Sequence, residues 1–191
     1  MNKLILIAGK FNPGAVALFQ SLCPQGFELE VFSDTEDRKT LEKKITRADY
    51  LFVRGGLPID DALLEKAKRL KMIQKWGVGY DRYDMELIGG KDIAFMNTAG
   101  GNAVQVAELT IGLLLAVYRR IVPAYTSLQH GVWRKEELLP QSHVIQGKTV
   151  GVVGIGNIGR RVAALCRAFG AEVQYYDAFP LEKQKEEELG V

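Results

Sequence analysis

Short apolar runs alternate with amphipathic segments over the first hundred residues of the chain. Runs suited to buried strands occupy residues 4–8, 27–32, 50–53, 72–76 and 93–96. Between them, apolar residues recur with helical spacing in residues 13–22, 36–45 and 60–70. Asn12 is expected to be the N-cap of the helix over residues 13–22, with Pro13 at its first position. Strands separated by helices of this length predict parallel pairing with right-handed crossovers.

We therefore expect an open, flavodoxin-like parallel sheet of about five strands over residues 1–99. Turn-forming residues at 97–102 mark a boundary. The next segment, Ala103–Tyr118, is apolar on most faces, which predicts a long helix buried between layers or subunits. Residues 125–146 show no regular pattern. We expect them to leave the globule and contact a second subunit.

A second strand–helix–strand pattern begins at residue 149. An apolar run is followed by Gly154, Gly156 and Gly159 in G-x-G-x-x-G spacing, by a helical pattern over 157–169, and by a strand ending at Asp177. In a dinucleotide site these glycines allow a tight turn, close approach of a pyrophosphate, and close packing of helix on strand. The pattern predicts the start of a Rossmann domain. The alternative is a glycine-rich turn followed by an acid by chance.

The acid at the end of this unit bears on the choice of cofactor. Asp177 follows Gly159 at close to the expected distance of about 20 residues. A carboxylate there accepts hydrogen bonds from the ribose hydroxyls and repels the additional phosphate of NADP. We therefore expect NAD as the cofactor.

Composition and charge narrow the class of partner. The chain is 47% hydrophobic and 25% charged with a net charge of +2, which favours neither nucleic acid nor a membrane surface. Its N-terminus is too short for a signal peptide, and no apolar stretch has the length of a membrane span. Cys23 and Cys166 have no metal-binding spacing and are expected to be reduced and buried. A cytoplasmic protein without a metal site is the expectation.

Two glycine-rich loops follow strands of the first region. Arg54-Gly55-Gly56 and Gly77-Val78-Gly79 lie where parallel sheets place their ligands, at the carboxyl ends of strands. Glycines expose backbone N–H groups, and the arginine fork suits a carboxylate or a phosphate. The alternatives are a solvated surface role for Arg54 and plain core packing for Val78.

Five blocks of sequence together resemble the D-isomer-specific 2-hydroxyacid dehydrogenases, above all their D-3-phosphoglycerate dehydrogenase and glyoxylate/hydroxypyruvate reductase branches. The blocks are VRGG at 53–56, KWGVGYDRYD at 75–84, NTAGGNAVQVAELTIGLLLAVYRR at 97–120, GVW at 131–133, and residues 146–177. The resemblance covers essentially the whole chain. It implies an NAD-dependent oxidoreductase that transfers hydride between NAD(H) and a small 2-keto or 2-hydroxy acid, acting as a homodimer.

The resemblance also implies roles for individual residues. Residues 1–99 would form the substrate-binding domain; residues 100–191 would hold an interdomain helix, a dimerisation excursion and the first βαβ unit of the NAD-binding domain. The implied substrate anchors are Arg54, Gly55, Val78 and Gly79. The implied cofactor contacts are Val78, Val106, Gly154, Gly156, Asn157, Ile158, Gly159 and Asp177.

The arginine, glutamate and histidine that act in catalysis in this family lie further along the chain than the end of this sequence. His130 and His143 do not match the position of the catalytic histidine. We therefore expect a truncated chain with no catalytic residue and no turnover of its own. Two alternatives stay open, an NAD-sensing or protein-interaction module and a flavodoxin-like binding domain that uses no dinucleotide.

Overall fold

A computed structural model describes residues 2–33 and 35–191. The chain divides into two compact units, Met1–Ala99 and Gly100–Val191, here called the N-terminal and the C-terminal unit. None of the helices in the described residues combines the length and the apolar character of a membrane span.

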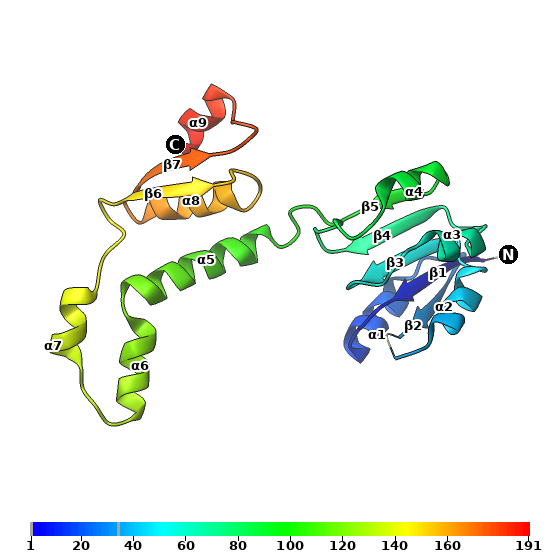
Figure 1. Ribbon diagram of the computed structural model, residues 1–191, viewed down its shortest axis with the longest axis horizontal. Helices are drawn as coiled ribbons and strands as arrows, with labels where there is room; N and C mark the ends of the chain where they lie inside the picture. The colour runs from blue at the N-terminus through cyan, green and yellow to red at the C-terminus, as the bar shows by residue number, and fades with distance from the viewer. Residues whose placement is uncertain (1, 34) are drawn as a thin grey trace. The chain divides into compact units, whose positions relative to one another are not determined.

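The N-terminal unit contains one parallel five-stranded sheet with the order β2-β1-β3-β4-β5 (Figure 1). Its strands are β1 Lys3–Ala8, β2 Phe27–Phe32, β3 Tyr50–Arg54, β4 Met72–Trp76 and β5 Ala94–Met96. Its helices are α1 Pro13–Leu22, α2 Arg38–Ile45, α3 Asp61–Lys66 and α4 Met85–Gly90. The expected flavodoxin-like sheet is confirmed. The strand order reverses direction at β1 and β3, where such sheets bind their ligands.

Helices α2, α3 and α4 cover one face of this sheet. Leu41 and Ile45 of α2, Leu63 of α3 and Ile88 of α4 are at most 1% exposed and share one core with the strands. Helix α1 contributes no buried residue. It contacts the sheet instead through aromatic rings, with the ring centroid of Phe19 lying 5.2 Å from that of Phe52.

Side-chain caps set where the helices of this unit begin. Asp37, Asp60 and Asp84 each accept a backbone N–H three residues ahead, so α2 begins at Arg38 rather than at the expected residue 36. Helix α3 ends at Lys66 and not at residue 70, because Ala67 leaves helical geometry. Helix α4 was not predicted, since its two terminal glycines hide the helical pattern.

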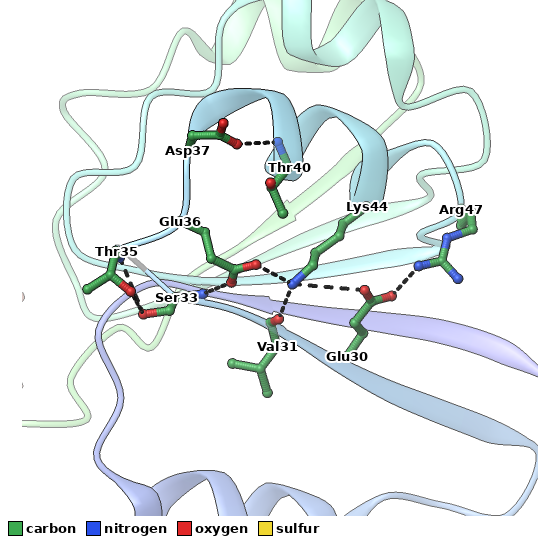
Figure 2. A network of polar contacts seen from close by, with 9 residues as sticks. All are labelled: Glu30, Val31, Ser33, Thr35, Glu36, Asp37, Thr40, Lys44 and Arg47. Atoms are coloured by element: carbon green, nitrogen blue, oxygen red, sulfur yellow. Dashed lines mark hydrogen bonds and ion pairs between the residues drawn. The ribbon is translucent and has the colours of Figure 1, made fainter.

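A network of polar contacts ties α2 to the edge strand β2 (Figure 2). The Lys44 ammonium donates to the Val31 carbonyl and to Glu36, both at 2.7 Å, and Glu30 pairs with Arg47 at 2.7 Å. Glu36 in turn accepts the Ser33 N–H at 2.6 Å. The half-buried ammonium of Lys44 therefore has both a carbonyl and a carboxylate as partners.

The C-terminal unit is built on two parallel strands, β6 Thr149–Val153 and β7 Glu172–Tyr176, joined by α8 Gly159–Ala168 (Figure 1). Its other helices are α5 Ala103–Tyr118, α6 Ile121–Gln129, α7 Lys135–Leu138, the 3-10 turn Leu139–Gln141 and α9 Lys183–Leu189. Helix α5 packs along α8. Ile111 of α5 joins Val152, Ala163 and Val173 in the core. The predicted bounds of α5 match those observed.

The segment expected to be irregular, residues 125–146, contains the end of α6, the whole of α7 and the 3-10 turn, with non-helical residues between and after them. Helix α6 begins already at Ile121, directly after Arg120, whose φ of 53° turns the chain between α5 and α6. Pro123 lies in the first turn of α6, where proline is tolerated because the N–H groups of that turn have no partner within the helix. Helices α6 and α7 project away from the β6–β7 layer (Figure 1).

Helix α5, expected to be buried between layers or subunits, buries only part of its apolar surface within the single chain. Within the described residues only Ala103, Ala107 and Ile111 of this helix are buried. Leu109, Leu113 and Val117 are 59–66% exposed. Glu108, the acid of this helix, faces solvent.

Candidate functional site

The carboxyl edge of the N-terminal sheet brings together the ends of β1, β3 and β4. Gly9 follows β1 with a φ of 130°, and a Cβ there would lie 2.4 Å from the Arg54 carbonyl oxygen. Glycine is therefore required for β1 and β3 to end side by side. Gly55 has a φ of 81° with open space around it. A cavity of about 460 Å³ opens here, lined by Lys10, Arg54 and the glycines after β3, among others.

The loop after β4 is fixed by residues that follow β5. The Gly77 N–H donates to Thr98 Oγ1 at 2.9 Å, the Thr98 N–H donates to the Gly77 carbonyl at 3.1 Å, and the Asn97 amide donates to the Val78 carbonyl at 2.7 Å. Among residues 2–33 and 35–191, the N–H groups of Val78 and Gly79 form no hydrogen bond. These two N–H groups of the loop are thus free for a ligand.

Aromatic rings hold the side chain of Arg54. Its guanidinium carbon lies 5.8 Å from the ring centroid of Phe11 and 5.5 Å from that of Trp76, and Nη1 donates to the Lys10 carbonyl at 3.3 Å. Arg54 forms no ion pair within the described part of the chain. Cation–π contact orients the guanidinium without neutralising it. Sequence reasoning missed both rings, although β3–β4 pairing sets Trp76 directly opposite Arg54.

Lys75, one residue before Trp76, is a second cation that sequence reasoning missed. The residue is only 8% exposed, and its ammonium donates to the Trp76 carbonyl at 3.1 Å. A Cβ at Gly77 would lie 3.7 Å from this ammonium, so the charge sits directly behind the Gly77–Gly79 loop. Burial, and after it the charge of Arg54, lower the pKa of Lys75 below its ordinary value.

The glycine turn of the C-terminal unit is tight, and it brings α8 close to β6. Gly154 has a φ of 92°, and its N–H donates to the Tyr176 carbonyl at 2.7 Å. A Cβ on Gly159 would lie 1.9 Å from the Gly154 carbonyl oxygen, so only glycine lets α8 pack this close to β6. The space at Gly156 is open. The turn therefore leaves room for a ligand at the N-terminus of α8.

Asp177 organises the same turn. Its Oδ2 accepts the Ile155 N–H at 2.6 Å and its Oδ1 accepts the Phe179 N–H at 2.9 Å. The hydrogen bond from Phe179, then that from Ile155, hold the pKa of Asp177 below its ordinary value, and the charge of Arg160 adds to the effect. The carboxylate is thus ionised and positioned, and each oxygen keeps a lone pair for a hydroxyl group.

The remaining predicted cofactor contacts also lie in the C-terminal unit. Asn157 points its amide at Gly100, where a Cβ would lie 3.1 Å from Nδ2, and Ile158 is 38% exposed. Val106 is half-buried on α5. His130 contacts the Thr126 carbonyl at 2.8 Å. Over the described residues, no group of His, Cys, Asp and Glu side chains is arranged to hold a metal ion.

The protein has a parallel sheet with an open carboxyl edge and, separately, a glycine turn whose N–H group is bound by an aspartate. These two features define the class of dinucleotide-binding α/β proteins. Residues 5–186 match the family described as D-isomer specific 2-hydroxyacid dehydrogenase, catalytic domain. The chain belongs to this family, as its sequence blocks predicted.

Two curated relatives illustrate the match. The chain is 35% identical to a D-3-phosphoglycerate dehydrogenase of Methanocaldococcus jannaschii, over 98% of this chain and 34% of the relative. It is 40% identical to a hydroxypyruvate reductase of Thermotoga maritima, over 78% of this chain and 48% of the relative. The chain thus spans about a third to a half of the length of these relatives.

Solved structures agree with the fold. The NAD+-bound 3-phosphoglycerate dehydrogenase of Entamoeba histolytica superposes with a TM-score of 0.72 at 26% identity, over 99% of this chain and 59% of that one. A dehydrogenase of Rhizobium meliloti superposes with a TM-score of 0.75 at 29% identity, over 93% and 60%. The NAD+ in the Entamoeba enzyme agrees with the cofactor expected from Asp177.

Proposed function

We propose that this chain supplies the substrate-anchoring loops and the first half of the NAD site of a D-2-hydroxyacid dehydrogenase. The whole protein would transfer hydride between NAD(H) and C2 of a small 2-keto or 2-hydroxy acid. The observation that carries this proposal is the ionised Asp177 carboxylate, held against the glycine turn by two backbone N–H groups.

Each unit has its own part in this proposal. In the N-terminal unit, the free N–H groups of Val78 and Gly79 and the guanidinium of Arg54 bind the anionic substrate, with Gly55 leaving room beside them. In the C-terminal unit, the turn formed by Gly154, Gly156 and Gly159 takes the pyrophosphate, with Asn157 and Ile158 beside it. Val78 and Val106 are the proposed contacts to the nicotinamide half.

The proposal assigns binding to this chain and proton transfer to residues outside it. His130 is engaged with its own helix, and His143 packs edge-on against Tyr118 with ring centroids 5.9 Å apart. We therefore expect residues 1–191 alone to bind NADH without steady-state turnover, because general acid–base help is worth about 10²–10⁴-fold.

We also propose that the protein forms a homodimer through α5 and α6. Support comes from the apolar side chains that these helices leave exposed, among them Leu113, Val117, Val122 and Tyr125, all at 59% or more. Such a patch on a folded protein marks an interaction surface.

The test of the proposed function is a calorimetric titration of Asp177→Asn with NADH and with NADPH. The wild-type chain binds NADH more tightly than NADPH, because Asp177 repels the additional phosphate. The variant binds NADH about 10- to 100-fold more weakly, since it loses hydrogen bonds to a charged acceptor. Its preference for NADH over NADPH narrows.

Glu172→Gln is the matched control, because Glu172 is an exposed acid at the start of β7. The Glu172→Gln variant is expected to bind NADH and NADPH as tightly as the wild-type chain does. An equal loss of NADH and NADPH in Asp177→Asn means that the turn collapsed and that no ribose contact was lost. Absence of NADH binding to the wild-type chain contradicts the proposed function.

A further inference from the structure

Arg160 binds the glycine turn of the C-terminal unit from the side of helix α8. Its Nε–H donates to the Ile155 carbonyl at 3.0 Å, and its backbone N–H donates to the Gly156 carbonyl at 3.1 Å. One residue therefore holds two successive carbonyls of the turn. Among residues 2–33 and 35–191, the guanidinium of Arg160 forms no other hydrogen bond and no ion pair. The polar contact of this side chain is thus to the turn.

Holding these two carbonyls also sets the direction of the N–H groups that follow them. A peptide unit is planar and trans, so its C=O and its N–H point in opposite directions. Because the Ile155 carbonyl faces Arg160, the Gly156 N–H points away from it, and the Gly156 carbonyl fixes the Asn157 N–H in the same way. Neither N–H group forms a hydrogen bond in the described part of the chain. Both are therefore oriented and free for a ligand.

Gly156 makes this orientation easy to lose. The space around Gly156 is open, and glycine reaches backbone conformations that other residues avoid. Rotation of the Ile155–Gly156 peptide would aim a carbonyl oxygen, in place of the Gly156 N–H, at a bound phosphate. No side chain among the described residues caps α8, whereas aspartates cap α2, α3 and α4. The hydrogen bond from Arg160 to Ile155 is therefore the contact that opposes this rotation.

We propose that Arg160 is a positioning residue of the cofactor site, which holds the Ile155 carbonyl and so keeps the Gly156 and Asn157 N–H groups directed at the pyrophosphate. The inference rests on the proposed function, in which this turn takes the pyrophosphate. Arg160 acts through the hydrogen bond that its Nε donates, and the charge of its guanidinium is not required. In this it differs from a residue that pairs directly with the phosphates.

Two substitutions separate the hydrogen-bond donor of Arg160 from its charge. In Arg160→Gln, the amide nitrogen is bonded to Cδ as Nε is in arginine, so the donor stays at the same place in the side chain while the charge is lost. In Arg160→Lys, the charge stays, but a methylene group takes the place of Nε and the ammonium lies one atom further out. The proposal therefore predicts that glutamine replaces Arg160 better than lysine does.

The test is a titration of the wild-type chain and both variants with ADP and with adenosine, followed by NMR of the ligand. Arg160→Lys binds ADP about 3- to 10-fold more weakly than the wild type, because the turn spends less time in the arrangement that binds phosphates. It binds adenosine as the wild type does, since adenosine carries no phosphate. Arg160→Gln binds both ligands as the wild type does.

Arg161→Lys is the matched control. Arg161 is the next residue of α8, is exposed, and forms no side-chain hydrogen bond or ion pair within the described residues. The same change at this position leaves the affinities for ADP and adenosine as they are in the wild type.

Three results overturn the inference. Weaker ADP binding in Arg160→Gln than in Arg160→Lys means that the charge acts on the phosphates directly. Equal ADP affinities of the two variants mean that the Nε donor has no role of its own. Parallel loss of ADP and adenosine binding in Arg160→Lys means that the whole turn has collapsed. If the wild type binds ADP and NADH, these results remove this inference alone; if it binds neither ligand, the proposed function fails as well.

Discussion

At the scale of single residues, hydrogen bonds distinguish a carboxylate that stabilises the fold from one that is available to a ligand. Asp177 and Asp49 are both ionised carboxylates that accept backbone N–H groups. Asp49 also forms an ion pair with Arg69 of the same unit, at 3.0 Å. Asp177 has no such partner at its side among the described residues, which leaves it available to a ligand. Asp49 is therefore expected to matter for stability and Asp177 for binding.

We predict that Asp49→Ala destabilises the N-terminal unit by about 1–3 kcal/mol at pH 7, because the buried Leu4 N–H loses its acceptor. Arg69→Ala, the matched control, costs about 0–1 kcal/mol, since its side chain is half exposed. Urea unfolding followed by circular dichroism measures both. An effect of Arg69→Ala as large as that of Asp49→Ala contradicts this account.

The lowered pKa of Asp49 predicts that the free energy of unfolding of the N-terminal unit depends on pH. Burial alone would raise the pKa of Asp49, but the Leu4 N–H and Arg69 together lower it below its ordinary value of 3.8. A lowered pKa means that the stabilisation is fully present above about 3.8 and is lost as the pH falls through the folded-state value. The stability difference between wild type and Asp49→Ala therefore stays constant from pH 7 to pH 5 and shrinks below pH 4. A difference that persists unchanged at pH 3 would falsify this assignment.

At the scale of elements, the close packing of α8 on β6 depends on the absence of a Cβ at Gly159. We predict that Gly159→Ala destabilises the C-terminal unit by about 1–3 kcal/mol, because the new Cβ meets a backbone carbonyl that cannot rotate away. NADH binding weakens with it. Gly112→Ala is the control. Gly112 lies inside α5, and apart from its chain neighbours and the backbone of its own helix no heavy atom lies within 4 Å of its Cβ position, so the change stabilises the helix by about 0.5–1 kcal/mol. Urea denaturation of the two variants should give opposite signs; equal signs contradict the packing argument.

At the scale of the whole molecule, the exposed apolar faces of α5 and α6 lead to a prediction about association. Sedimentation of the wild-type chain should show a dimer. Leu113→Glu, at a position on α5 that is 59% exposed, should give a folded monomer, because a charge is placed within the proposed interface. Leu18→Glu, at a position on α1 that is 55% exposed, should leave the dimer intact. A monomeric wild-type chain, or equal loss of association in both variants, contradicts the proposed interface.

The sequence was sufficient for features that depend on neighbours along the chain. Alternating apolar runs predicted the five-stranded sheet, and the Asn12–Pro13 pair predicted the start of α1. The apolar pattern did not predict α4, which ends in two glycines that disfavour a helix. It also did not predict α6, in which few regularly spaced apolar residues indicate a helix. Of the proposed site, the glycine turn and both loops were predicted, whereas Lys75 and the rings around Arg54 were not.

What the sequence determined by itself is the order of the elements and the family, because periodicity, turn residues and motif spacing are local properties. What only the tertiary structure decided is which charges are satisfied. Whether Lys75 is a solvated lysine or a buried cation depends on the strands and helices that pack around it, and these come from residues far away in the chain. In the same way, Asp177 lies next to the glycine turn because β6 and β7 pair in parallel, which brings its carboxylate to the Ile155 N–H.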